Sequence, residues 1–359
     1  MVFNPTRLTL ARRRRGITKI RLAELAGVVS RSISMYESGS HAPPGGMIDA
    51  LASALKVPPQ FFTGPTLDEP PSEGASFRSL KSMTAGQKDA VLAAGALAYC
   101  LDDWISSRFT LPKANIPDVR EFTPEDAAEY TRAHWRIGES SIRNMIHLLE
   151  LHGVRVFSLA EDNAQVDAFS VWRNDTPYVF LNTMKSAEHS RFDAAHELGH
   201  LVMHRHASHN RDIEHEANRF ASAFLMPKGS VLGVGRVGPS LGNFIALKRT
   251  WNVSLAALLY RMRSLNLISE WHYRTLCIEI NKRGFHKKEP NGIERETSQI
   301  LNKVFTALWS EKVTRADVAR QLCMSQDDLD ALVFKVMVAD QTGEGIDVET
   351  PPGPRLRLI

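Results

Sequence analysis

The pentapeptide His196-Glu197-Leu198-Gly199-His200 (HELGH) is the most informative stretch of this sequence. It lies within residues 186–205, whose pattern predicts a helix, and residues four apart on an α-helix share one face. Two imidazoles at that spacing can bind one cation. Zinc accepts two neutral nitrogens and a carboxylate, with a fourth position left for water. We therefore predict His196 and His200 as metal ligands and Glu197 as the general base that activates water for attack on a peptide carbonyl.

A third ligand is expected from the next helical stretch, residues 212–225. Its apolar stripe begins at Ala217, and Glu214 lies three residues earlier on the same inward face. Glu216 points roughly 100° away from Ala217, so we predict Glu214 as the ligand and keep Glu216 as the alternative. Asn218 is expected to orient a ligand through a hydrogen bond from the second coordination shell.

Three stretches before the motif, 153–159, 168–172 and 178–182, are rich in β-branched and aromatic residues and predict strands. The last is expected to pack in the core, to pair with an extended substrate, or both. Strands, an HExxH helix and then an acidic helix follow the order that a zincin needs. The alternative is a chance HExxH match, since many such matches lie on solvated helix faces. Further histidines are interpreted individually as surface or loop residues: His189, His204, His206, His209 and His215.

The stretches 191–204 (RFDAAHELGHLVMH) and 213–227 (IEHEANRFASAFLMP) resemble the ImmA/IrrE-type zinc metallopeptidases. The resemblance covers roughly residues 126–265. It implies an α+β zincin-like domain that binds Zn²⁺ and cleaves a protein substrate, such as a transcriptional repressor cut at one site.

Roles for individual residues follow from the same resemblance. The implied ligands are His196, His200 and Glu214, and the implied catalytic residue is Glu197. Asn218 departs from the Asp that other glutamate zincins carry on this helix. A neutral amide still orients an imidazole but adds no charge, so the basicity of the ligand is tuned differently.

A second motif combines LAELAGV at 22–28 with SRSISMYESG at 30–39. Gly27 permits a sharp turn between two helices, and Ser30 is expected to cap the second one. Outward residues at the start of such a helix reach base edges in the major groove. The predicted DNA-binding residues are Ser30, Arg31, Ser32 and Ser34. Residues 6–64 resemble the Xre/Cro-type helix-turn-helix domain, which implies a duplex DNA operator as partner and commonly a homodimer.

Charge is distributed unevenly along the chain. Residues 1–64 carry nine Lys and Arg residues against three acidic residues, a net charge of +6, whereas the remainder carries 35 against 37, a net charge of −2. A basic module of this kind indicates contact with phosphates. The run Arg12–Arg15 is interpreted either as a phosphate contact or as a solvated helix end, and a bundle that binds only protein is the alternative for the module.

Composition excludes several classes of protein. The chain has 359 residues, of which 43% are hydrophobic, so it is long enough for two or three globular domains. No apolar run reaches the roughly 18 residues that span a bilayer, and no secretory h-region is visible. Its three cysteines form no CxxC pair. We therefore expect a cytoplasmic protein with no membrane partner, no disulfide framework and no thiolate zinc site.

We predict a multidomain chain with an all-α helix-turn-helix bundle, an α+β zincin-like (HExxH) metallopeptidase domain and a helical C-terminal region. The predicted segments are an Xre-type DNA-binding domain (1–64), a linker and connecting helix (65–123), the metallopeptidase domain (124–229), a helical pair that completes it (230–285), a small helical C-terminal domain (286–340) and a disordered tail (341–359). The predicted function is a bacterial DNA-binding regulator with a zinc-dependent endopeptidase domain. The alternatives are a transcriptional regulator whose metal domain senses zinc or a ligand without proteolysis, and a peptidase whose first domain binds only protein.

Overall fold

The computed structural model describes residues 2–71, 83–159, 168–205, 211–235, 237–286 and 288–337. The predicted tail (341–359) and His206 and His209 lie outside these ranges. The chain divides into two compact units: Met1–Leu111, Phe157–Val166 and Gln299–Ile359 form unit 1, and Pro112–Val156 and Asp167–Ser298 form unit 2. The six predicted segments stay predictions, because compactness alone does not define where an independently folding domain begins.

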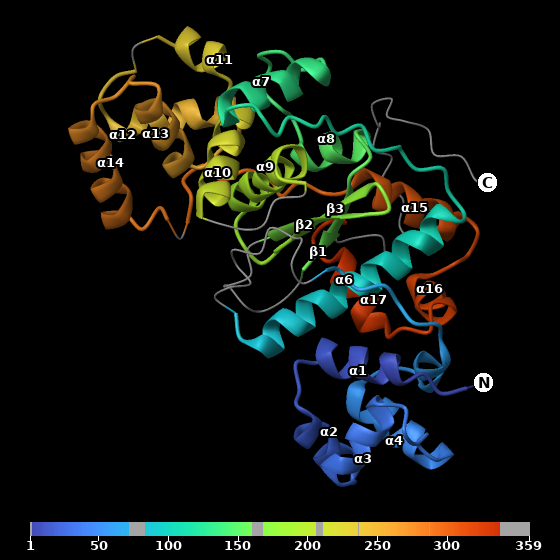
Figure 1. Ribbon diagram of the computed structural model, residues 1–359. Helices are drawn as coiled ribbons and strands as arrows, with labels where there is room; N and C mark the ends of the chain where they lie inside the picture. The colour runs from blue at the N-terminus through green and yellow to red at the C-terminus, as the bar shows by residue number, and fades with distance from the viewer. Residues whose placement is uncertain are drawn as a thin grey trace. The chain divides into compact units, whose positions relative to one another are not determined.

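Unit 1 begins with a small helical bundle (Figure 1). Its elements are α1 (Pro5–Arg14), α2 (Lys19–Ala26), α3 (Ser30–Glu37), α4 (Gly45–Leu55) and the 3₁₀ helix η1 (Pro59–Thr63). Thr18 caps α2 by accepting a hydrogen bond from the Arg21 amide at 3.1 Å. Gly27 ends α2 with φ of 70°, a left-handed conformation that glycine adopts without strain. This is the turn that the sequence predicts between the two helices of the motif.

The remaining helices of unit 1 come from distant parts of the chain. They are α6 (Ala85–Ser106), α15 (Gln299–Ser310), α16 (Arg315–Gln321) and α17 (Gln326–Val333). Helix α6 is buried on most of its surface and contacts both α1 and α17. The Trp104 indole nitrogen donates a hydrogen bond to Gln321 Oε1 at 3.2 Å, which joins α6 to α16. The C-terminal helices therefore pack in the same unit as the N-terminal bundle.

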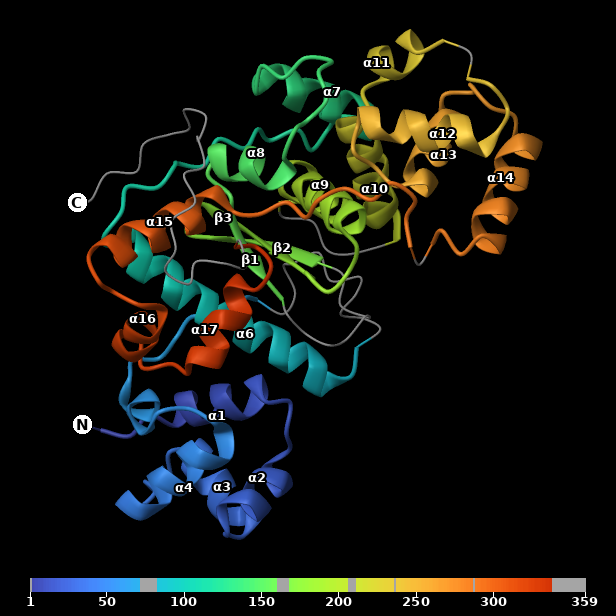
Figure 2. The same cartoon turned by 180° about the vertical axis from the view of Figure 1, so that it is seen from behind.

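Unit 2 combines helices with a small sheet (Figure 2). Its helical elements are α7 (Pro124–His134), α8 (Met145–Leu151), α9 (Ala187–Met203), α10 (Arg211–Leu225), α11 (Lys228–Gly233), α12 (Leu241–Leu247), η2 (Lys248–Thr250), α13 (Leu255–Ser264) and α14 (Glu270–Lys282). Helix α7 ends at His134, and α8 begins only at Met145. Among the described residues, no helix has the length and apolar character needed to cross a bilayer.

The sheet has the strand order β1-β3-β2, with β1 at Arg155–Ser158, β2 at Ala168–Arg173 and β3 at Thr176–Leu181. β2 and β3 form an antiparallel hairpin in which Ser170 lies opposite Val179. β3 has a neighbour on each side, so the expectation that this strand could pair with a substrate at an edge is wrong. β2 is the strand that ends the sheet beside the HExxH helix, since α9 packs on β2.

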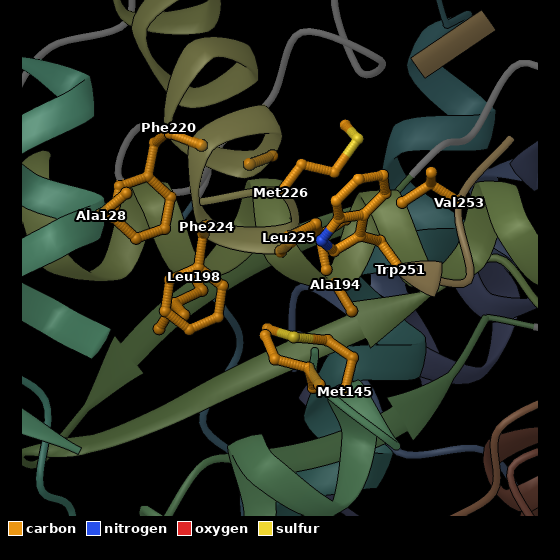
Figure 3. Close-up of a cluster of buried hydrophobic side chains, with 14 of the residues drawn as sticks. Ala128, Met145, Ala194, Leu198, Phe220, Phe224, Leu225, Met226, Trp251 and Val253 are labelled. Atoms are coloured by element: carbon orange, nitrogen blue, oxygen red, sulfur yellow. The ribbon is translucent and has the colours of Figure 1, made fainter. Parts of the chain in front are cut away.

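The core of unit 2 lies where α9 and α10 pack side by side. Figure 3 shows part of it, with Leu198 of α9 and Phe220 and Phe224 of α10 among the labelled side chains. Gly199 allows the close approach: a Cβ built there would lie 3.0 Å from Phe220 Cδ1 and 3.3 Å from the Cα of Ala217. A side chain at this position would push α10 away from the HExxH helix.

Candidate metal centre

Helix α9 is fixed at its start and buried along most of its length. The Ser186 side chain caps it by accepting a hydrogen bond from the His189 amide at 3.2 Å. Leu198 and its buried neighbours anchor the helix to the core, so the rotation of the helix is set by packing. The same rotation brings His196 and His200 to one side, where α10 lies opposite.

Three predicted ligand residues come together at this point. The Nε2 atoms of His196 and His200 lie 3.0 Å apart. The Glu214 carboxylate faces both rings, with its oxygens 3.4 Å from His196 Nε2 and 3.6 Å from His200 Nε2. Their potential ligand atoms all lie within 4.8 Å of one another. Within the described ranges, no other group of His, Cys, Asp and Glu residues meets this criterion.

The electrostatic environment of these rings favours a cation. Burial by itself would lower the pKa of His196, but the carboxylates of Glu214 and Glu197 outweigh that effect and raise it above its ordinary value. Glu214 is 6% exposed and Glu197 is 2% exposed, so water screens these charges weakly. Two imidazole nitrogens and one carboxylate are a donor set that zinc accepts, and the residues present therefore fit this metal.

Glu216, the alternative ligand, lies elsewhere. Its Oε2 atom is 2.9 Å from Nε2 of His204, and its side chain is 43% exposed, compared with 8% for Glu214. This difference follows from the helical position of the two glutamates, since Glu214 is on the buried face of α10. His204 follows the last residue of α9, and its side chain is only 8% exposed and is held by this contact.

The outer nitrogens of the two facing imidazoles also have partners. His196 Nδ1 lies 3.1 Å from Oδ1 of Asn218, and His200 Nδ1 lies 3.2 Å from Nδ1 of His204. Asn218 is therefore placed where the sequence predicts it, beside a facing imidazole. Both rings turn Nε2 toward Glu214 and Nδ1 toward a polar side chain.

Glu197 points toward the sheet side of α9. Its Oε2 accepts a hydrogen bond of 2.7 Å from the Ser170 hydroxyl on β2, and both residues are buried. Sequence reasoning missed Ser170, although strand alternation places every second residue of β2 on one face. It also missed Asp193, a carboxylate one helical turn before His196 whose pKa is raised by burial.

The predicted DNA-binding residues lie at the start of α3. Arg31 is exposed, and Ser30, Ser32 and Ser34 are partly exposed, while Ile33 is fully buried and anchors the helix. The expectation that Ser30 caps α3 is wrong: Val29 occupies the N-cap position and makes no side-chain cap hydrogen bond. Ser30 is the first residue of the helix, and Val29 is 68% exposed beside it.

The arginine run Arg12–Arg15, at the end of α1, is paired with carboxylates. All four guanidinium groups form ion pairs at distances between 2.6 and 3.3 Å. The pairs are Arg12 with Glu37, Arg13 with Glu69 and Asp89, and Arg14 and Arg15 with Asp328. These ion pairs contradict a solvated helix end, whereas the phosphate contact stays a prediction.

Two segments of the chain match known protein families. Residues 149–263 are similar to the IrrE N-terminal-like domain, a peptidase family. Residues 8–62 are similar to the helix-turn-helix family. No curated protein matches the chain.

The two matches account for the two sites. The IrrE-like region contains α9 and α10 with the buried His-His-Glu group, and a metallopeptidase-like domain of this family implies a metal, typically zinc. The helix-turn-helix region contains α2, Gly27 and α3. Together they confirm the predicted multidomain fold class and support a DNA-binding regulator that carries a metallopeptidase-like domain.

Proposed function

We propose that the protein is a DNA-binding regulator whose IrrE-like domain is a zinc-dependent endopeptidase. In this proposal His196, His200 and Glu214 bind Zn²⁺, and Glu197 is the catalytic base. The observation that carries it is the convergence of two Nε2 atoms and the Glu214 carboxylate within 4.8 Å in a buried position next to Glu197. Burying ionisable groups costs free energy unless a counter-charge is present. A purely structural role therefore does not explain why His200, Glu214 and Glu197 are buried beside one another.

The chemistry divides between the metal and Glu197. A zinc ion supplies Lewis acidity, which activates water and polarises a peptide carbonyl. Glu197 accepts the proton of the attacking water and transfers it to the leaving amine. Ser170 holds one oxygen of Glu197 at 2.7 Å, so the carboxylate keeps one orientation through the reaction.

We assign the substrate to the class of extended peptide segments in a protein, such as a transcriptional repressor cut at one site. β2 ends the sheet, and within the described residues no strand pairs with its outer edge. Main-chain hydrogen bonds to such an edge bind an extended chain with little demand on its sequence. Ser170 lies on β2 and contacts Glu197, so a peptide paired with this strand passes close to the catalytic base.

The helix-turn-helix region is proposed to bind a duplex DNA operator, commonly as a homodimer. Arg31 is exposed at the start of α3, and Ser30, Ser32 and Ser34 lie on the same turns. Residues at this position of a recognition helix reach base edges in the major groove. Residues 1–64 carry a net charge of +6. Glu69, Asp89 and Asp328 neutralise Arg13, Arg14 and Arg15, and only the charge that remains adds attraction to the phosphate backbone.

Two substitutions test the peptidase. The Glu197→Gln protein should keep its zinc but lose cleavage, whereas His196→Ala should lose zinc. Zinc is measured by elemental analysis of the purified full chain, and cleavage by mapping new protein N-termini in cells that produce each variant. If Glu197→Gln generates the same N-termini as the wild type, the base assignment is wrong. If the wild-type chain generates no new N-termini while zinc changes its affinity for DNA, the metal domain is a sensor.

A further inference from the structure

A third histidine continues the series on α9. His204 lies one turn after His200 and is the C-cap residue of the helix, where its amide donates to the His200 carbonyl at 2.9 Å. Its ring is held on two sides: Nδ1 is 3.2 Å from His200 Nδ1, and Nε2 is 2.9 Å from Glu216 Oε2. The His204 side chain is 8% exposed, so its ring is largely shielded from water, whereas the Glu216 side chain is 43% exposed.

Hydrogen-bond chemistry fixes the direction of this chain of contacts. A neutral imidazole has one N–H donor and one acceptor nitrogen, and a carboxylate only accepts. In a neutral His204 the proton is therefore on Nε2, where it is donated to Glu216. Its Nδ1 is then an acceptor, and the contact with His200 requires His200 to donate from Nδ1. That tautomer leaves the lone pair of His200 on Nε2, the atom that faces Glu214.

We propose that His204 is a positioning residue that holds His200 in the tautomer and orientation needed to bind the metal, with Glu216 fixing the tautomer of His204. This inference rests on the proposed function, since it concerns one of the proposed zinc ligands. It also gives Glu216 a function other than the direct coordination considered from the sequence. Outer partners of ligating histidines act in this way by fixing the ring and raising its basicity.

Helix α10 contacts the rings of His196 and His200 in two different ways. Asn218 of α10 reaches His196 Nδ1 directly at 3.1 Å. Glu216 of α10 reaches His200 only through His204. Because α9 continues past His200 by one more turn, His204 fills the distance that the Glu216 side chain would otherwise have to span.

Direct ligation by His204 does not fit the geometry. Its Nδ1 approaches the outer nitrogen of His200, on the side of that ring away from Glu214, and its Nε2 is taken by Glu216. The group of potential ligand atoms that lie within 4.8 Å of one another contains His196, His200 and Glu214 but not His204. The series of three histidines therefore provides two inward nitrogens and one outer support.

The first test measures zinc affinity of the full chain by competition with a chromophoric chelator. His204→Leu should weaken Zn²⁺ binding by about 10–100-fold, the usual effect of losing an outer-shell partner. His204→Asn places an amide oxygen near the position of Nδ1 and should restore part of that affinity, while Glu216→Ala should weaken binding with the histidine retained. His215→Leu is the matched control, because His215 is an exposed histidine on α10 and its loss should leave zinc affinity unchanged.

The second test reads the tautomers directly. In the zinc-loaded chain labelled with ¹⁵N-histidine, long-range ¹H–¹⁵N correlation spectra should show His204 protonated on Nε2 and His200 protonated on Nδ1. A purely structural role of His204 would change stability without setting these signals. Protonation of His204 on Nδ1, or zinc affinity of His204→Leu and Glu216→Ala within twofold of wild type, overturns the proposal. Failure of the wild-type chain to bind zinc overturns the proposed metal centre itself, so the two failures are distinguishable.

Discussion

Gly199→Ala tests whether the close approach of α9 and α10 builds the metal centre. The added methyl group would lie 3.0 Å from Phe220 Cδ1 and 3.3 Å from both Phe220 Cβ and the Cα of Ala217, where relaxed carbon contacts are about 3.5–4.0 Å. Two of these three atoms cannot rotate away, so the helices must separate by roughly 0.3–1 Å. Overpacking of this kind costs about 2–3 kcal/mol, and the better helix propensity of alanine offsets about 1 kcal/mol. We expect a net loss of about 1–2 kcal/mol.

The same displacement should reach the ligands. Glu214 lies three residues before Ala217 on α10, so moving α10 outward moves the carboxylate away from the two imidazoles. Zinc affinity should fall by about tenfold or more, as for other losses of ligand positioning. The assays are urea denaturation of the metal-free chain and zinc competition with a chelator. Gly233→Ala is the control, because a Cβ built there meets nothing within 4 Å. Equal stability and equal zinc affinity of Gly199→Ala and wild type would refute the reasoning.

Three further substitutions test other parts of the molecule. Lys248 is 1% exposed and lies 3.2 Å from Glu188 and 3.3 Å from Glu289. Lys248→Met should therefore lower the free energy of unfolding of unit 2 by about 3–5 kcal/mol in urea denaturation. A loss below about 1 kcal/mol would contradict a buried ion-pair network. Burial, and then the neighbouring His134, lowers the pKa of His152 from 6.5 to about 4. Between pH 4 and 6.5 the unfolded chain therefore binds a proton on His152 that the folded chain does not bind. The free energy of unfolding should fall as the pH drops from 6.5 toward 4. His152→Phe keeps the stacking on Trp135 and should flatten this part of the pH dependence, whereas an unchanged slope in denaturation at pH 4.5 and 6.5 argues against the assignment. Arg31→Ala should cost about 1–3 kcal/mol in binding to a duplex selected from a random DNA library, and equal affinity in a fluorescence anisotropy titration would remove Arg31 from the DNA contact.

Local periodicity was sufficient for the central part of the site. The spacing of His196 and His200 predicts that both side chains share one helix face, and the structure brings their Nε2 atoms within 3.0 Å. Helical geometry also separates Glu214 from Glu216, because residues two apart point about 160° apart around the helix. Both results depend only on the period of a single helix, which the sequence contains directly.

The outer contacts could not be predicted in this way. The role of His204 depends on Glu216 of the neighbouring helix, and no local pattern specifies how two helices rotate against each other. Pairing order within a sheet is equally non-local, so the central position of β3 was not visible from its composition. The partner of Arg15 is Asp328, which is 313 residues away in the chain. The regular spacing of four residues from His196 to His200 to His204 is the sequence signal that points to His204.

The ion pairs of α1 have a practical consequence for studies of truncated proteins. Arg13, Arg14 and Arg15 are neutralised by Glu69, Asp89 and Asp328, all of which lie beyond residue 64. A fragment that ends at residue 64 would expose these three guanidinium groups on a polypeptide of net charge +6. Heparin, RNA or any other polyanion would then adhere to it, so an isolated N-terminal fragment overstates the affinity of the intact protein for nucleic acid.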